Sequence, residues 1–212
     1  MLRGVAGRVS LWNRARKMKL FLEHMGPGAE TRVVDVGVGD TGFATEPGTA
    51  LSHNYFEAMY PWPERITAVS DVPLPRFAED FPMIECVTAD GRRLPFEDDS
   101  FDIAYSNAVL EHVGGPVEQR EFLRELCRVA PRVFVSTPNR WFPIEVHTLL
   151  PLLHWLPRRP RDWILGRLRP EIWGRVELVS RRQLLELFPE TVDARVIESR
   201  ITIAAIAVRS AG

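Results

Sequence analysis

The chain has 212 residues, which is enough for one sizeable domain and short for two. Its 45% apolar residues fit a globular protein with its own core, and its net charge of −1 provides no overall field that would favour a nucleic acid. The two cysteines, Cys86 and Cys127, lie far apart and belong to no paired motif. This argues against a disulfide scaffold or a cysteine-based metal site, and we expect a reducing, cytoplasmic location.

The first 25 residues are basic and contain no unbroken apolar run of signal-peptide length. Leu11, Leu20 and Phe21 recur at helical spacing, so we expect an amphipathic helix, and residues 1–30 are read as a helical lead-in to the domain. No stretch of the sequence reaches the roughly 18 apolar residues that a membrane-spanning helix needs.

Short apolar runs alternate with helical patterns through the next hundred residues. Strands are expected at 31–37, 65–71, 84–90, 101–107 and 132–138. Helices are expected between them, at 54–60, 76–81 and 116–130. Such alternation requires crossover connections, and it predicts an α/β fold with a parallel sheet and helices on both faces.

The last third of the chain has a different composition. Residues 141–168 are rich in Pro, Trp and Leu and suit no strand, so we expect a helical lid inserted over 141–176. A helix is expected at 180–188, with Ser180 as its cap.

Two further strands close the chain, at 194–200 and 201–209. Almost no residue separates them, so they must form a hairpin, and the sheet is expected to end in an antiparallel pair. The whole chain, 1–212, is read as a single domain with seven strands.

Three glycines follow the first expected strand within six residues. Gly37, Gly39 and Gly42 spell G-x-G-x-x-G, the spacing of the dinucleotide fingerprint. The first glycine would make a tight turn, and the second would let a ligand approach the backbone. A glycine-rich turn that binds nothing is the alternative, because this motif is weak by itself.

The same stretch resembles the first motif of class I methyltransferases that use S-adenosylmethionine, which runs acid-x-Gly-x-Gly. Asp35, Gly37 and Gly39 occupy these positions. The resemblance implies that Asp35 organises the loop and faces the positive methionine end of the cofactor, whereas a nicotinamide enzyme has no need for such an acid. An acid that only caps a turn is the alternative for Asp35.

Residues after the next three strands extend the resemblance. Asp71 ends the second strand, where a carboxylate can accept hydrogen bonds from both ribose hydroxyls. After the third strand, Asp90 and its neighbour Gly91 match the family's adenine-binding stretch, and Leu94 matches an apolar residue that packs on the adenine ring. After the fourth strand, the run that begins with Asn107 is similar to a family stretch with leucine, glutamate and histidine, so Asn107 is counted with the cofactor-binding residues.

The resemblance covers roughly residues 30–140 and implies a Rossmann-like, doubly wound, mostly parallel seven-stranded sheet with an antiparallel C-terminal hairpin. The sequence departs from the family pattern in two places. Thr41 stands where the third glycine is usual, and the insert 44–53 lengthens the separation of Asp35 and Asp71 to 36 residues. A loop of that size can fold over the cofactor or the substrate.

Methyl transfer to oxygen or nitrogen also requires removal of a proton from the acceptor, and a neutral histidine suits this task near pH 7. His112 follows the fourth strand and His147 follows the fifth, both at the carboxyl edge where ligands bind. We expect His147 to be the general base, with Glu145 as a residue that orients it. His112 is the second candidate, and a hydrogen-bonded residue at a helix start is the alternative for it.

Two stretches bear on the acceptor. Residues 138–143 place Asn139, Arg140 and Trp141 at the mouth of the expected site, which suits a small acceptor rich in hydroxyls or bearing a carboxylate, although an exposed turn is the alternative. Residues 148–168 combine Leu and Trp with Arg. This composition fits either a packed lid or a surface that meets lipid headgroups.

The sequence therefore predicts a methyltransferase that modifies a hydroxyl of a sugar, a lipid-linked compound or a secondary metabolite. A nicotinamide-dependent oxidoreductase is disfavoured, because no Tyr-x-x-x-Lys pair exists and the two lysines, Lys17 and Lys19, both precede the glycine motif. A partner protein that keeps the fold without turnover is the other alternative. No nucleic-acid partner and no resident metal are expected.

Overall fold

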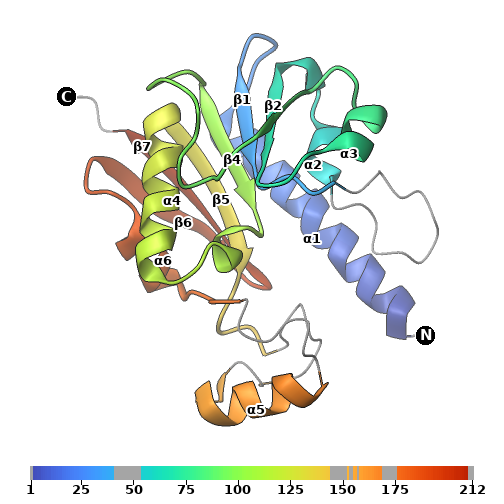
Figure 1. Cartoon of the computed structure of the whole chain (residues 1–212), viewed down its shortest axis with the longest axis vertical. Helices are drawn as coiled ribbons and strands as arrows, with labels where there is room; N and C mark the ends of the chain where they lie inside the picture. Colours follow the sequence, from blue (N-terminus) through green and yellow to red (C-terminus); the bar gives the residue numbers. More distant parts are fainter. Residues whose placement is uncertain are drawn as a thin grey trace.

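The computed structural model describes residues 2–40, 54–143, 152, 155–156, 158–168 and 176–209. In this part of the chain, a central sheet carries helices on both faces (Figure 1). The seven strands are ordered β3-β2-β1-β4-β5-β7-β6.

The strands follow the expected order along the chain. They are β1 Val33–Val36, β2 Ile66–Ser70, β3 Glu85–Thr88, β4 Ile103–Asn107, β5 Arg132–Pro138, β6 Val192–Ser199 and β7 Thr202–Arg209. The pairs from β3 to β5 are parallel, whereas β7 runs antiparallel to both β5 and β6. The predicted mostly parallel sheet with an antiparallel C-terminal hairpin is confirmed.

The helices also match the expected segments. They are α1 Leu2–Met25, α2 Tyr55–Met59, α3 Pro75–Asp80, α4 Pro116–Val129, α5 Arg158–Leu168 and α6 Arg181–Leu187, with 3₁₀ turns η1 Pro63–Arg65 and η2 Leu110–His112. Ser180 caps α6 as predicted. Its side chain accepts a hydrogen bond from the Gln183 backbone, and its own backbone N–H donates to the Gln183 side chain, which completes a capping box.

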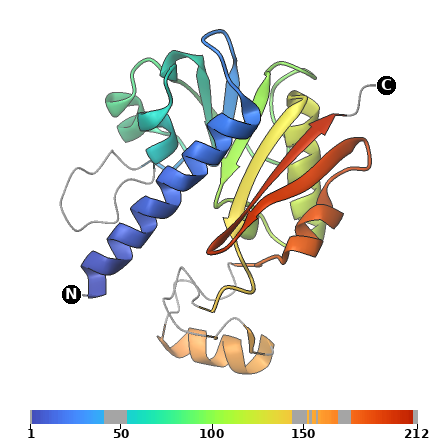
Figure 2. The ribbon, with the colours of Figure 1, turned by 180° about the vertical axis from the view of Figure 1, so that it is seen from behind.

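Two apolar layers sandwich the sheet. On one face, α4 and α6 bury Phe122, Leu126 and Leu184. On the other face, α1 lies across the strands, as Figure 2 shows from behind. Phe21 of α1 is fully buried there, and its ring centroid lies 5.4 Å from that of Tyr105 on β4. The N-terminal helix is therefore a packed part of the sheet's cover, because its apolar stripe at helical spacing faces the strands.

Helix α5 lies apart from the helices that flank the sheet. Both views place it beyond the end of the sheet toward which the parallel strands run (Figures 1 and 2). None of the helices described here is long and apolar enough to cross a membrane.

We predict that Gly91→Ala destabilises the fold, because Gly91 lies against the core. A Cβ at this position would lie 2.6 Å from Phe122 Cε2 and 2.9 Å from Val36 Cγ1, and both neighbours are buried. Overpacking of this kind should lower the free energy of unfolding by roughly 1–3 kcal/mol in urea denaturation.

The matched control is Gly166→Ala on α5, where a Cβ meets no atom within 4 Å. This substitution should leave stability unchanged or raise it slightly, since alanine favours a helix. Equal unfolding midpoints for the Gly91→Ala variant and the unsubstituted protein would contradict the packing explanation.

Candidate functional site

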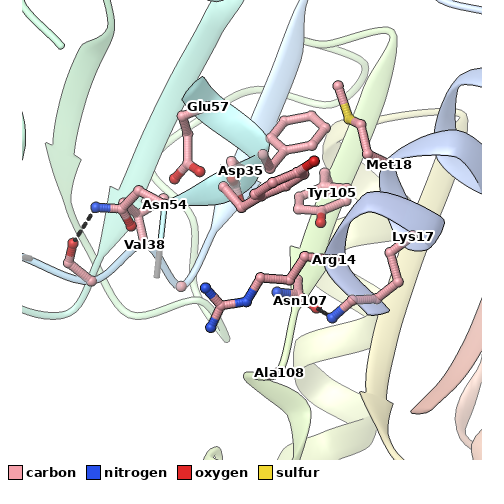
Figure 3. Close-up of a pocket in the computed structure, with 14 residues that line it drawn as sticks. Arg14, Lys17, Met18, Asp35, Val38, Asn54, Glu57, Tyr105, Asn107 and Ala108 are labelled. Carbon is pink, nitrogen blue, oxygen red and sulfur yellow. Dashed lines mark hydrogen bonds between the residues drawn. The ribbon is translucent and has the colours of Figure 1, made fainter. Parts of the chain in front are cut away.

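A cavity of about 180 Å³ lies where the strand order reverses, between β1 and β4. The connection from β1 leads to β2 on one side, whereas β4 leads to β5 on the other, so this is the switch point where open α/β sheets bind ligands. Its walls come from α1, the loop after β1, the start of α2 and the end of β4 (Figure 3). The predicted residues Asp35, Gly37, Gly39 and Asn107 all line it.

Asp35 is buried in this wall, and its neighbour is an acid that the sequence analysis did not single out. Glu57 of α2 is also buried, and the two carboxyl groups share a hydrogen bond. Burial raises the pKa of Asp35 well above its ordinary value, and the Glu57 carboxylate raises it further. Burial likewise raises the pKa of Glu57 to about 7. The pair therefore retains a proton near neutral pH.

Gly37 and Gly39 have different structural roles in the loop. Gly37 has φ +100°, and a Cβ there would lie 2.1 Å from Val109 Cγ2, so the turn and its packing both require glycine. Gly39 lines the cavity, and its carbonyl accepts a hydrogen bond from Asn54 Nδ2 at 3.2 Å. Gly42 and Thr41 lie outside the described residues.

Asp40 holds this loop to the neighbouring helix. Its Oδ1 accepts hydrogen bonds from the backbone N–H groups of Arg76 at 2.8 Å and Phe77 at 3.1 Å, in the first turn of α3. Leu74, the residue before α3, has no side-chain acceptor to cap the helix. The sequence analysis missed this role, for which the available signal was an acid beside the glycine motif and a helix that begins at Pro75 without a capping residue.

Four other predicted residues follow β2 and β3 at the same edge of the sheet without lining the cavity. Asp71 is exposed directly after β2. Asp90 follows β3 and pairs with Arg92, whose Nη2 lies 2.6 Å from Asp90 Oδ2. The Arg92 hydrogen bonds lower the pKa of Asp90. Gly91 packs on the core, and Leu94 is buried on the α4 side of the sheet.

Lys17 of α1 is a cavity residue that the sequence analysis missed as well. It is 6% exposed, and its Nζ donates to Asn107 Oδ1 at 2.5 Å. Burial lowers the pKa of Lys17 to about 8, and the nearby Arg14 guanidinium adds to this effect. The available signal was the position of Arg14 and Lys17, one turn apart on a helix whose neighbouring residue Phe21 faces the core.

The buried ammonium group carries a cost in stability. The unfolded chain binds more protons than the folded one between the folded pKa of about 8 and the ordinary value of 10.5. The contribution of Lys17 is therefore unfavourable below pH 8, on the order of 3 kcal/mol, and is relieved as the pH rises through this window.

His112 ends η2 at the edge of the site, outside the cavity wall. Its side chain is 44% exposed, and its Nε2 lies 3.9 Å from Oε1 of the buried Glu111. The other Glu111 oxygen accepts a hydrogen bond from Thr137 Oγ1 at 2.9 Å. The other predicted catalytic residues, His147 and Glu145, lie outside the described residues.

Comparisons with known proteins agree with this arrangement. Residues 34–132 match a family model described as a methyltransferase domain. YcgJ from Bacillus subtilis is similar in structure, with a TM-score of 0.63, 15% identity, and coverage of 93% of this chain and 100% of that one. The search of the curated proteins gave no match.

Two more solved structures show the same fold. A SAM-dependent methyltransferase from Thermotoga maritima has a TM-score of 0.62 and 14% identity, covering 97% of this chain and 92% of its own. The N-methyltransferase NodS from Bradyrhizobium japonicum, in complex with S-adenosylhomocysteine, has a TM-score of 0.58 and 14% identity, with 93% and 87% covered.

Residues 34–132 therefore match a methyltransferase domain, and the fold of the chain is shared with solved methyltransferase structures. The cofactor that the sequence analysis expects is S-adenosylmethionine, and the NodS structure contains the related S-adenosylhomocysteine. The cavity fits that group chemically, because it brings acids, cations and the backbone of a glycine loop together at the switch point of the sheet.

We predict that lysine-selective NMR resolves a side-chain signal with a midpoint of about 8, since burial disfavours the charged form of Lys17. The chain has two lysines, so the variant Lys17→Met identifies the signal by its loss. The signal of Lys19, whose side chain is 71% exposed, serves as a reference within the same spectrum. A midpoint at the ordinary value of 10.5 for Lys17 would contradict its burial in the cavity wall.

Proposed function

We propose that this protein is an enzyme that transfers a methyl group from S-adenosylmethionine to a hydroxyl of a small molecule. The observation that carries the proposal is the cavity at the β1–β4 switch point, lined by Asp35, Gly37, Gly39 and Asn107. When bound, the cofactor supplies an electrophilic methyl group on a positively charged sulfur. The protein then has to align the acceptor and exclude water.

In this proposal, residues at the ends of the strands make the remaining contacts to the cofactor. Asp71, exposed after β2, accepts hydrogen bonds from the ribose hydroxyls. Asp90, with Gly91 beside it, lies by the adenine amino group after β3. The burial of Leu94 leaves the adenine ring to pack elsewhere. Asn107 and the glycine loop face the methionine end.

Proton removal from the acceptor is assigned to a histidine. We propose His147 as the general base, oriented by Glu145, because both follow β5 at the edge where ligands bind. His112 is the second candidate, because its half-exposed ring already lies next to the Glu111 carboxylate. Glu111 is fixed by its hydrogen bond with Thr137, which suits a residue that orients another.

The structure of the turn after β5 limits which of its side chains are available to contact the acceptor. The Asn139 amide donates to the Arg200 carbonyl at 2.9 Å, and its oxygen accepts from the Trp141 backbone at 3.0 Å, so this side chain holds the turn together. In this proposal Arg140 and the exposed Trp141 contact the acceptor, and Trp141 lines a separate hollow with Arg181 and Arg182 of α6. A guanidinium beside an aromatic ring suits a sugar or a carboxylated secondary metabolite.

We predict that the protein binds S-adenosylhomocysteine in calorimetry and does not bind NAD. The variant Gly39→Val should lose at least about tenfold in affinity, because its side chain would fill the cavity that Gly39 lines. Urea denaturation checks that the variant is folded.

The outcomes separate the alternatives. Binding of NAD in preference to S-adenosylhomocysteine would favour an oxidoreductase. No binding of S-adenosylhomocysteine at high micromolar concentration would favour a partner protein without turnover. Unchanged affinity in Gly39→Val would move the cofactor away from this cavity.

A second proposal concerns α5. We propose that α5 belongs to the lid formed by residues 141–176 and that it also contacts lipid headgroups. Trp163 on α5 is 61% exposed, and the Arg167 guanidinium stacks over its ring at 4.3 Å. Trp155 and Leu156 are exposed nearby in sequence. Exposed tryptophan beside arginine is typical of a membrane interface with anionic lipids. The two free cysteines are consistent with a location at the cytoplasmic face of such a membrane.

We predict that the full-length chain co-floats with vesicles that contain phosphatidylserine, and that Trp163→Ala reduces the floated fraction several-fold, since Trp163 provides exposed aromatic area. The matched control is Val117→Ala on α4, which removes a comparably exposed apolar side chain from another face. Absence of co-flotation, or an equal loss in both variants, would contradict the lipid contact and leave α5 as a lid.

A further inference from the structure

A hollow of about 570 Å³ lies between the turn after β5 and the beginning of α6. Its described lining consists of one tryptophan from the turn and a mostly polar set from α6 and its cap: Trp141, Ser180, Arg181, Arg182, Leu185 and Glu186. None of these residues lines the cavity at the β1–β4 switch point. The segment that matches the methyltransferase domain ends at residue 132, before every one of them. The hollow is therefore a separate recess to which that match assigns no role.

The hollow lies at the same edge of the sheet as the cavity. Strands β4 and β5 are parallel neighbours, and Asn107 at the end of β4 pairs in register with Ser136 of β5. Trp141 follows the end of β5 by three residues. The Glu177 backbone N–H donates to the Glu111 carbonyl at 2.8 Å, which ties the segment before α6 to the η2 turn after β4. One acceptor can therefore extend from the cavity to the hollow across the ends of two adjacent strands.

Trp141 is the aromatic wall of the hollow, and its surroundings are fixed. It is 61% exposed, although its backbone is held by the hydrogen bond to Asn139. The ring of Trp155 lies beside it, with the two centroids 6.0 Å apart, and Trp155 Nε1 donates to the Arg140 carbonyl at 2.9 Å. An indole face that is held in this way provides apolar contact area with little loss of conformational entropy on binding.

The α6 wall of the hollow carries one positive charge in excess. Arg182 Nε lies 2.7 Å from Glu186 Oε1, so these two side chains compensate each other. Arg181 is exposed and forms no ion pair with any residue in the part of the chain that the structure describes. Its guanidinium can donate two parallel hydrogen bonds to a carboxylate. A phosphate dianion suits the wall less well, because Glu186 would repel its second charge.

These features together favour a sugar ring that bears one carboxylate. A sugar presents a face of C–H groups that can cover an indole ring, and Leu185 adds a second apolar contact. Its hydroxyl groups point outward from the ring and stay hydrated in an open hollow. A neutral sugar would leave Arg181 unused, whereas the carboxylate of a uronic acid lies at the ring edge, where a guanidinium beside the indole can reach it.

We propose that this hollow is an acceptor-recognition subsite for an acidic sugar, in which Trp141 stacks on the ring and Arg181 binds its carboxylate. The inference rests on the proposed function, because the hydroxyl to be methylated has to lie at the β1–β4 cavity while the acidic ring occupies the hollow. It names the acceptor class as a glycan or glycoside with a uronic acid outside the methylated unit.

The test compares two probes by titration in ligand-observed NMR at pH 7. Methyl β-glucuronide carries a carboxylate where methyl β-glucoside carries a hydroxymethyl group. The unsubstituted protein should bind the glucuronide about fivefold more tightly, the scale of one exposed charge-assisted hydrogen bond. Arg181→Met should remove this preference and leave the glucoside affinity unchanged. Trp141→Ala should weaken both probes several-fold.

The chain offers a matched control for each substitution. Trp163 on α5 is also 61% exposed and does not line the hollow, so Trp163→Ala should leave both affinities unchanged. Arg120 is exposed on α4 away from the hollow, and Arg120→Met should behave in the same way. Saturating S-adenosylhomocysteine should not displace the glucuronide, because the two recesses share no described residue. Urea denaturation checks that each variant is folded.

The outcomes separate the subsite from the proposed function. Equal affinity for the two probes, an undiminished preference in Arg181→Met, or tighter binding of glucose 6-phosphate than of the glucuronide would overturn the carboxylate contact. Equal losses in Trp141→Ala and Trp163→Ala, or displacement by S-adenosylhomocysteine, would overturn the location. Glucuronide binding without any binding of S-adenosylhomocysteine would overturn the proposed function while the sugar-binding hollow stands.

Discussion

The parallel pairing of β1 with β4 is the constraint on which the rest of the site depends. It sets Asp35 opposite Tyr105 and leaves the strand ends at a point where the crossovers diverge. Phe21 then packs α1 against Tyr105 with a ring-centroid distance of 5.4 Å. Because this contact fixes the position of α1 along the sheet, the residues one turn before Phe21 lie beside the carboxyl ends of the strands. The strand order creates the cavity, and the packing of α1 against the core determines which positively charged residues line it.

Burial then sets the charges of that cavity. It lowers the pKa of Lys17 to about 8 and raises that of Glu57 to about 7, so both pKa values are shifted toward neutral pH. At neutral pH, Lys17 still favours its charged form, whereas Glu57 is divided between its two forms. A positively charged group beside the carboxyl pair would favour the ionised form of Glu57.

Much of this structure could be predicted from the sequence, because alternating strand and helix patterns determine the sheet, and the acid-x-Gly-x-Gly run marks its switch point. Glu57 could not be assigned, since its role arises from the packing of α2 over β1, and the signal for Lys17 was only its helical spacing from Phe21. Gly91 has a packing role that the sequence did not indicate, because a Cβ there would lie 2.6 Å from Phe122 Cε2, and its predicted cofactor contact stays a prediction. The predicted base His147 stays a prediction, because it lies outside the described residues.

A crystal structure with S-adenosylhomocysteine at saturating concentration tests the central claim most directly. We expect its amino-acid end beside Asp35 and Asn107, its ribose beside Asp71, and its sulfur at the glycine loop after β1. A crevice beside Asp35 and Gly37 that stays vacant in such a crystal, or a ligand bound at another edge of the sheet, would contradict it.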